Sequence, residues 1–377
     1  MELTNALKEY MVVHSAEALE LLKELACIPA PSGHEEKRAE FCLRWLEKQG
    51  AKGAYIDEAL NVVYPLGCEN GGEITVFVAH SDVVFPDTEP LELKEENGRI
   101  YCPGVGDDTA NAVALMMAAK CIAQHGFAPK EGGVLLVINA AEEGLGNLKG
   151  TRRLMEKYGS RVKEFISFDS QNDSGVCTAV GSCRYRVTVE TEGGHSFRDF
   201  GNRSAIAVLA RLIDALYAIK VPQKGKTTYN VGTVSGGTSV NTIAQQAEML
   251  YEFRSDERDS LEEMEKAFRE KLESAREEGV HITVESVGER PCSGDVDEKK
   301  QAELMARADE VYRRHYGTPV RYSSGSTDCN IPLSMGIPSV CVGGWVGAGA
   351  HTREEYVEES SLQPGLLVAC ELILRHF

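Results

Sequence analysis

The sequence lacks the features that mark several large classes of protein. No apolar run approaches the roughly 18 residues that a membrane-spanning helix requires, and no low-complexity tract interrupts the chain. Basic residues are in the minority, with 40 Lys and Arg against 58 Asp and Glu. The resulting formal charge of −18 would repel nucleic acid and anionic lipid. We therefore expect neither a nucleic-acid partner nor a membrane partner.

Paired cysteine motifs are also missing. The 11 cysteines are odd in number, scattered and nowhere arranged as CxxC, which argues against a disulfide framework and against a thiolate zinc site. The first 25 residues have early acidic side chains and amphipathic spacing, without the basic start and apolar block of a signal peptide. These features predict a cytoplasmic protein.

The length and the apolar pattern predict two domains. A chain of 377 residues exceeds the size at which one core usually stops growing. Continuous apolar runs alternate with helical stretches, which is typical of an α/β domain with a mostly parallel, doubly covered sheet. Between them, strands and helices follow in the order β-α-β-β-α-β of a ferredoxin-like α+β unit. We predict a first domain built from residues 1–184 and 294–377, with residues 185–293 inserted.

Polar side chains follow four of the apolar runs at the point where each run ends. In such sheets, sites form beyond the carboxyl ends of the strands, so residues distant in sequence can converge. "ITVFVAHSD" ends in His80 and Asp82, "GGVLLVINAAEEG" in Glu142 and Glu143, "EFISFDSQND" in Asp169, and "PSVCVGGWVGAGAHT" continues to His351.

A glycine-rich loop, "PGVGDDTAN", adds two adjacent carboxylates, Asp107 and Asp108. His, Asp and Glu without Cys suit a hydrolytic zinc, manganese or cobalt site, and two such ions can share a bridging carboxylate. The set with the right ligand types is His80, Asp107, Glu143, Asp169 and His351.

Neighbours of these candidate ligands have other predicted roles. Glu142 is available as a general base, and Asp82 is placed to orient the His80 imidazole. Asp108 is expected to set the turn and to cap a helix beginning near Ala110. Each residue taken alone is more often an ordinary turn or cap residue. A buried Glu142-Glu143 pair, however, would be costly without a cation or another partner.

One further local pattern lies upstream. Ser32 and Glu35 have the spacing of a capping box for the helix that follows them.

The motifs "HSD", "GVGDD", "AAEEG", "FDSQ" and "GAHT", in this order around an inserted βαββαβ unit, resemble those of the co-catalytic zinc peptidases. That family includes peptidase T, carboxypeptidase G, aminoacylase, acetylornithine deacetylase and succinyl-diaminopimelate desuccinylase. The resemblance covers nearly the whole chain. It implies a zinc-exopeptidase-like catalytic domain, a lid that also dimerises, and two divalent metal ions per subunit, most often zinc.

The resemblance also assigns roles to individual residues. It implies that His80 and Asp169 bind one metal, that Glu143 and His351 bind the other, and that Asp107 bridges them. Glu142 matches the general base, and Asp82 matches the carboxylate behind the first histidine. The peptide bond after Asp107 is expected to be cis.

In the inserted unit and the last segment, the resemblance extends to substrate contacts. "GGHSF" matches the lid histidine, so His195 would stabilise the oxyanion of the tetrahedral intermediate. In this family a small residue often follows the histidine, whereas here Phe197 is expected either to narrow the pocket or to pack against the lid. The implied substrate-binding positions are Asn241, Arg254, Gly325, Thr327 and Gly344, although for Asn241 and Arg254 an ordinary role at a strand end competes.

Three functions remain open at this level. The first is a hydrolase that cleaves an amide bond in small peptides with a free N-terminus, as in aminopeptidases, dipeptidases and tripeptidases. The resemblance favours this function, because in that family Asp at the position of Asp169 is more associated with aminopeptidases and dipeptidases, and Glu with deacylases and carboxypeptidases. The second is a deacylase or carboxypeptidase that acts on N-acyl amino acids with the same machinery. The third is a binding protein that has lost catalysis, which the complete set of candidate ligands argues against.

Overall fold

The structure is a computed structural model, and it describes residues 3–377. The chain forms two compact units. The first comprises the chain up to Ala179 together with Gly294–Phe377, and the second is the intervening Val180–Ser293. The second unit begins before Tyr185, because its first strand, β9, starts at Gly181.

A mostly parallel sheet of eight strands forms the centre of the first unit, in the order β1-β2-β6-β3-β7-β16-β8-β15. The neighbours β6, β3, β7 and β16 all run parallel, whereas β1 and β2 are antiparallel additions at one edge. The predicted α/β class is thereby confirmed. The strands are β1 (Tyr55–Ile56), β2 (Val62–Leu66), β3 (Ile74–His80), β6 (Gly133–Asn139), β7 (Val162–Phe168), β8 (Ser174–Ala179), β15 (Arg321–Gly325) and β16 (Ser339–Val342).

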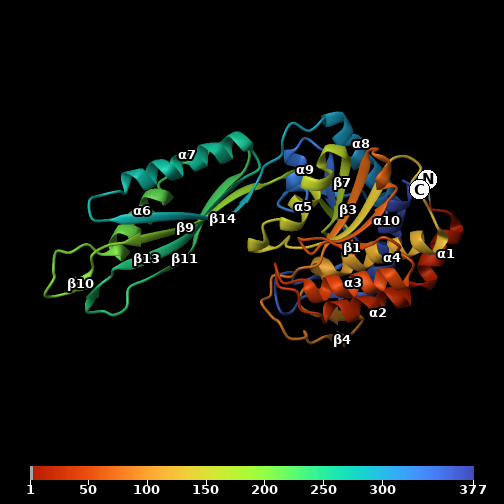
Figure 1. Ribbon diagram of the computed structural model, residues 1–377, viewed down its shortest axis with the longest axis horizontal. Helices are drawn as coiled ribbons and strands as arrows, with labels where there is room; N and C mark the ends of the chain where they lie inside the picture. The colour runs from red at the N-terminus through yellow and green to blue at the C-terminus, as the bar shows by residue number, and fades with distance from the viewer. Residues whose placement is uncertain (1–2) are drawn as a thin grey trace. The chain divides into compact units, whose positions relative to one another are not determined.

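Helices cover both faces of this sheet (Figure 1). Every residue of β3 and β6 is buried, as expected for strands with helices on both sides. Phe77 and Leu136 face a core shared with α1–α4, α8 and α10, while Val76 and Leu135 face a second core with α5 and α9. The helices are α1 (Asn5–Val13), α2 (Ser15–Ala26), α3 (Glu36–Lys48), α4 (Asn111–His125), α5 (Lys149–Tyr158), α8 (Glu298–Tyr316), α9 (Asn330–Ser334) and α10 (Leu362–Leu374).

A small antiparallel sheet in the first unit joins two loops that are distant in sequence. Its order is β17-β18-β5-β4, and β18 pairs with β5 through Tyr356 opposite Tyr101. The chain that precedes β18 therefore lies beside the chain that leaves β5. The strands are β4 (Lys94–Glu96), β5 (Arg99–Tyr101), β17 (Gly347–Ala348) and β18 (Tyr356–Glu358).

The second unit has the ferredoxin-like topology that the pattern of strands and helices predicts. Its antiparallel sheet has the order β11-β13-β9-β14, and two helices pack against it. Its elements are β9 (Gly181–Glu190), β10 (Gly194–His195), α6 (Ala205–Tyr217), β11 (Thr227–Gly236), β12 (Thr242–Ile243), β13 (Gln246–Ser255), α7 (Arg258–Ser274) and β14 (His281–Arg290).

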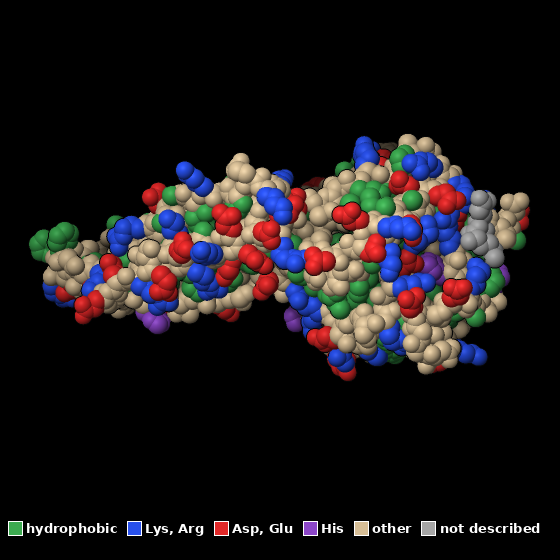
Figure 2. All heavy atoms as spheres, turned by 90° about the horizontal axis from the view of Figure 1, so that it is seen from above, with side chains coloured by type: hydrophobic (Ala, Val, Ile, Leu, Met, Phe, Trp, Pro, Cys, Tyr) green, Lys and Arg blue, Asp and Glu red, His purple; other side chains and the backbone are tan. Residues whose placement is uncertain are grey.

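The surface of both units carries acidic and basic side chains interspersed, as the view in Figure 2 shows. Among the described residues, no helix combines the length and the apolar character needed to cross a membrane.

Candidate active site

Three strands of the parallel sheet deliver the candidate ligands to one edge. His80 is the last residue of β3, Asp169 directly follows β7, and Glu142 and Glu143 follow shortly after β6. Because β6, β3 and β7 are parallel neighbours, their carboxyl ends lie side by side. The sheet thus brings together side chains that are up to 89 residues apart in sequence, counting from His80 to Asp169.

The Asp107 carboxylate lies between two histidines. Its Oδ1 is 3.1 Å from Nε2 of His80, and its Oδ2 is 3.1 Å from Nε2 of His351. His351 Nε2 is also 2.9 Å from Oε1 of Glu143, and His80 Nε2 is 3.7 Å from Oδ1 of Asp169. All five candidate metal ligands therefore surround one point of the fold, with Asp107 at the centre.

Two overlapping groups of these side chains are compact enough to hold a metal ion. The ligand atoms of His80, Asp107 and Glu143 all lie within 4.8 Å of one another, and so do those of His80, Glu142 and Asp169. Imidazole and carboxylate donors without thiolate fit zinc, manganese or cobalt. Glu142, which is predicted to be the general base, thus also lies close enough to His80 and Asp169 to bind the same metal ion.

The electrostatics of this cluster favour a cation. Burial, which disfavours the charged form, raises the pKa of Asp169 to about 7, and repulsion from the Asp107 and Glu143 carboxylates contributes to the same shift. Hydrogen bonds to Asp107 and Glu143 raise the pKa of His351 to about 11. For His80, burial opposes the charged form, but contacts with the surrounding carboxylates outweigh it and hold its pKa well above the ordinary value. Carboxylates are in excess, so the site stabilises positive charge.

Asp82 fixes more than the His80 imidazole. The Nδ1 atom of His80 lies 3.0 Å from the backbone carbonyl oxygen of Asp82, its hydrogen-bond partner, and 3.4 Å from Oδ1 of the same residue. That Oδ1 accepts a hydrogen bond from the backbone N–H of Glu142 at 2.9 Å. Oδ2 of Asp82 accepts from the N–H of Glu143 at 2.8 Å and from the Ser32 hydroxyl at 2.6 Å. Asp82 therefore contacts the His80 ring through its backbone carbonyl and its carboxylate, and the fully buried carboxylate also binds the backbone of the acidic pair.

The capping box predicted from Ser32 and Glu35 is wrong. Helix α3 begins without a side-chain cap, and the Ser32 hydroxyl donates to Asp82 instead. Glu35 is buried and accepts from the backbone N–H groups of Gly33 and Ala141. A long-range acceptor at the site thus replaces the local cap, and both residues support the strand ends.

The two carboxylates of the glycine-rich loop face different partners. The peptide bond between Asp107 and Asp108 is cis, as expected. The predicted capping role of Asp108 is wrong, because α4 has no side-chain cap at its start. Asp108 is buried and accepts from the backbone N–H of His80 at 2.9 Å and from the Asn111 amide at 2.7 Å. It therefore supports the end of β3.

Sequence reasoning missed three buried charged residues around the site. Arg38 is fully buried and donates to the carbonyl oxygen of Ser81 at 2.9 Å. Asp328 accepts from Asn139, at the end of β6, at 2.6 Å. Glu355 contacts the loop that carries Asp107. Glu355 lies four residues after His351 in "HTREEY", and this proximity is the one local signal that could have identified any of them.

The remaining candidates in the first unit lie in backbone turns. Gly344 is buried, and both of its backbone groups are used within the unit, by Asn111 and Tyr316. Thr327 is also buried and forms a turn at the start of α9 with Asn330. Gly325 ends β15 and is half-buried. The contacts of these three residues with substrate stay predictions.

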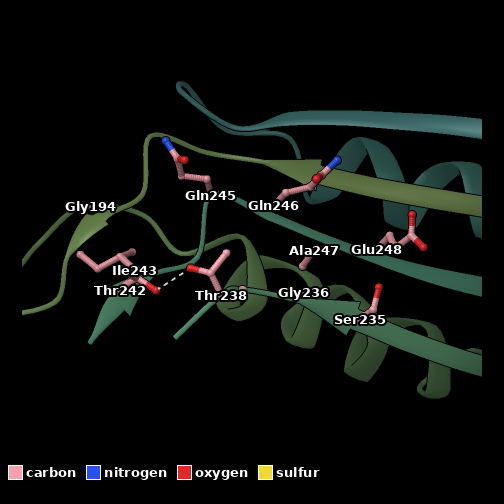
Figure 3. Close-up of a pocket in the computed structure, with 11 residues that line it drawn as sticks. Gly194, Ser235, Gly236, Thr238, Thr242, Ile243, Gln245, Gln246, Ala247 and Glu248 are labelled. Atoms are coloured by element: carbon pink, nitrogen blue, oxygen red, sulfur yellow. Dashed lines mark hydrogen bonds between the residues drawn. The ribbon is translucent and has the colours of Figure 1, made fainter. Parts of the chain in front are cut away.

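In the second unit, His195 and Asn241 belong to two loops that are tied together. β10 pairs with β12, which places His195 opposite Thr242, and the Ser196 N–H donates to the Asn241 carbonyl at 3.0 Å. Beside them is a hollow lined by hydroxyl and amide side chains of the 235–248 segment (Figure 3). Arg254 instead lies on β13, where it forms two hydrogen bonds with Glu252.

His195 is held in a defined orientation by its own loop. Its Nδ1 accepts from the backbone N–H of Phe197 at 3.2 Å and of Arg198 at 3.4 Å. The backbone N–H of His195 donates to the Asp199 carboxylate at 2.7 Å, and the backbone N–H of Asp199 donates to the carbonyl oxygen of His195. In a neutral imidazole one ring nitrogen carries the proton and the other accepts hydrogen bonds. Because Nδ1 of His195 accepts, the proton is on Nε2, and Nε2 is a hydrogen-bond donor.

Comparisons with known proteins relate most of the chain to one family. A family model described as "Peptidase family M20/M25/M40" matches residues 76–375. The chain is 29% identical to an acetylornithine deacetylase of Myxococcus xanthus over 52% of this chain and 54% of that protein. It is 24% identical to a succinyl-diaminopimelate desuccinylase of Halorhodospira halophila over 92% and 93%, respectively.

A solved structure has the same fold. A tripeptidase from Staphylococcus aureus matches 96% of this chain and 99% of its own, with a TM-score of 0.73 and 22% sequence identity.

Proposed function

Because the chain belongs to peptidase family M20/M25/M40, we propose that it is a dinuclear metal-dependent hydrolase that cleaves an amide bond in small peptides. The position of Asp107 carries this proposal, since its two carboxylate oxygens face His80 and His351 separately. This geometry allows one carboxylate to give one oxygen to each of two metal ions.

The donor set fits two divalent ions. His80 and Asp169 would hold one, Glu143 and His351 the other, with Asp107 shared between them. The excess of carboxylates over cations at this site supports the assignment. Zinc is the metal we propose, and the same donors also suit manganese and cobalt. When bound, the pair would supply Lewis acidity toward the scissile carbonyl and lower the pKa of a water molecule.

Glu142 is the general base in this proposal. Its backbone is held by Asp82, which places its side chain near His80 and Asp169. From there its carboxylate takes a proton from the attacking water and delivers it to the leaving amine. Asp82 acts through its neighbours, by fixing the backbone of the acidic pair and the ring of His80.

His195 is the proposed donor to the oxyanion of the tetrahedral intermediate. The two N–H groups that bond its Nδ1 keep the Nε2 proton available for this role. Donors oriented before the reaction stabilise developing charge without the cost of reorganisation. Asn241 lies on the loop tied to His195, which supports its proposed contact with substrate. Arg254, Gly325, Thr327 and Gly344 stay predictions from the family resemblance.

Replacing Asp199 with alanine tests the orientation of His195. We expect kcat to fall about tenfold, which is less than the 10²–10³-fold loss seen when an oxyanion donor is removed, because the ring stays but is less well ordered. Metal content should not change. Asp199→Asn is the matched control, because the amide oxygen of asparagine can still accept the hydrogen bond from the backbone N–H of His195. An equal fall in kcat in Asp199→Ala and Asp199→Asn would contradict the proposed role of Asp199 in orienting His195.

Two substrate classes are consistent with this site. Asp169 favours small peptides with a free N-terminus, whereas the two deacylase relatives favour the alternative, a deacylase or carboxypeptidase acting on N-acyl amino acids. A hydrolysis screen of di- and tripeptides beside N-acetyl and N-succinyl amino acids, with zinc, manganese or cobalt added, separates the two. If no amide in the panel were cleaved with any of the metals, the proposed activity would be refuted.

We also propose a homodimer formed through the second unit. The apolar face of α6 packs on its own sheet, so it does not provide the contact. The strand β11 does offer a surface, because it pairs only with β13 in the described part of the chain and exposes most of its residues. Light scattering should therefore give the mass of a dimer at micromolar concentration, and a monomer would remove this proposal.

A further inference from the structure

Glu355 occupies a position that connects the two loops of the site. It lies between His351 and strand β18, and its side chain is completely buried. The pairing of β18 with β5 brings it beside the chain that leaves β5, and the Cys102 N–H donates to its carbonyl oxygen at 3.2 Å. Its carboxylate therefore faces the glycine-rich loop that ends in Asp107.

The carboxylate binds three backbone N–H groups of that loop. Oε2 accepts from Gly104 at 2.8 Å, and Oε1 accepts from both Gly106 and Asp107 at 2.8 Å. A buried carboxylate is costly unless it is hydrogen-bonded, and three donors within one loop offset that cost. The Asp107 bond is the important one, because it fixes the backbone from which the bridging side chain projects.

The loop can follow this path only because it contains glycine. Gly104 has φ +75°, and a Cβ there would lie 2.2 Å from Cγ1 of Val83. A Cβ on Gly106 would lie 2.8 Å from the Trp345 ring. The glycines let the backbone approach closely, and Glu355 supplies the partner for the N–H groups exposed by that path.

We propose that Glu355 is a positioning residue that holds Asp107 in place for both metal ions and links it to His351 four residues away. The inference rests on the proposed metal site and concerns a residue that contacts neither ligand side chain. One short segment carries both His351 and Glu355, and Glu355 binds the loop that carries Asp107. A displacement of His351 therefore also displaces Asp107, and the reverse holds as well.

The neighbouring Glu354 provides a matched control. It is exposed and lies in the same segment, whereas the carboxylate that binds the backbone N–H groups of the loop belongs to Glu355. Glu355→Gln keeps the size of the side chain while placing an NH₂ donor where one oxygen accepts, so at least one of the three bonds is lost. Glu354→Gln makes the same chemical change without affecting the loop.

Metal binding is the first test. Metal-depleted protein is titrated with Co²⁺, followed by the visible absorption of the bound ion, and with Zn²⁺ by calorimetry. We expect Glu355→Gln to bind about 10–100-fold more weakly, as is typical when a group that orients a ligand is lost. Glu354→Gln should bind like the wild type. On a good substrate at saturating metal, kcat should fall while KM stays within about twofold, because the substrate pocket is unchanged. Unchanged metal affinity in Glu355→Gln would overturn the proposal.

A second test needs no variant. Hydrogen exchange of the metal-free wild type should show slow exchange for the amides of Gly104, Gly106 and Asp107, because Glu355 holds them before metal arrives. Exchange at the rate of an open loop would overturn the proposal even if Glu355→Gln failed to fold. Both measurements are independent of hydrolysis, so a failure of the proposed activity would be recognised separately, as normal metal binding and protection without turnover.

Discussion

Replacing Glu142 with alanine is expected to lower kcat by about 10²–10⁴-fold, the usual contribution of a general base, while two metal ions stay bound. The reason is that Glu142 transfers the proton in this proposal, whereas the five ligands are His80, Asp107, Glu143, Asp169 and His351. Steady-state kinetics and metal analysis of the same preparation check the two parts of the prediction together.

Glu143→Ala is the appropriate comparison. Both residues follow β6, and both have backbone N–H groups that bond to Asp82, so the two substitutions disturb the backbone similarly. Glu143→Ala should lose an ion, whereas Glu142→Ala should not. The Glu142 carboxylate lies within reach of a metal together with His80 and Asp169. If Glu142→Ala lost a metal ion, Glu142 would be a ligand and the assigned base would be wrong.

The substitution Asp107→Ala should have the second large effect. It removes a side chain whose two oxygens face His80 and His351 separately. We expect at most one tightly bound ion, and a loss of several kcal/mol of transition-state stabilisation, which corresponds to about 10³–10⁵-fold in kcat/KM. Equilibrium dialysis with metal analysis measures the stoichiometry directly.

The control for Asp107→Ala must leave the glycine-rich loop that carries Asp107 folded. Glu354→Gln, on the exposed part of the facing segment, should retain two ions and normal turnover. Two tight ions in Asp107→Ala would show that Asp107 does not bridge them, and the dinuclear proposal would then need another shared ligand.

The class of fold and the identity of the candidate ligands could be read from the sequence. Apolar runs such as Ile74–His80 are buried on both faces of the parallel sheet, and their length and composition predict this without tertiary information. The carboxyl ends of parallel neighbours meet at one edge, so residues at those ends converge whatever the details of packing. This is why the sequence alone points to His80, Glu143 and Asp169 as candidate ligands.

The residues that support the ligands could not be identified in this way. Ser32 has the spacing of a local cap, but its hydroxyl bonds Asp82, 50 residues away. Asp108 likewise bonds the backbone of His80 instead of the helix that follows it. In both cases a buried partner distant in sequence outcompetes the local one, because a buried polar group must be satisfied.

The sequence by itself therefore determined the sheet, the inserted unit and the ligand types, since these follow from periodicity and from the ends of strands. Only the tertiary structure decided which carboxylates point into the candidate metal site and which support the backbone of its ligands. Glu355 shows the difference: it is one of two adjacent glutamates, and only the pairing of β18 with β5 buries it against the Asp107 loop while Glu354 stays in solvent. Hydrogen bonds between segments 248 residues apart, as between Asp107 and Glu355, leave no pattern in either segment alone.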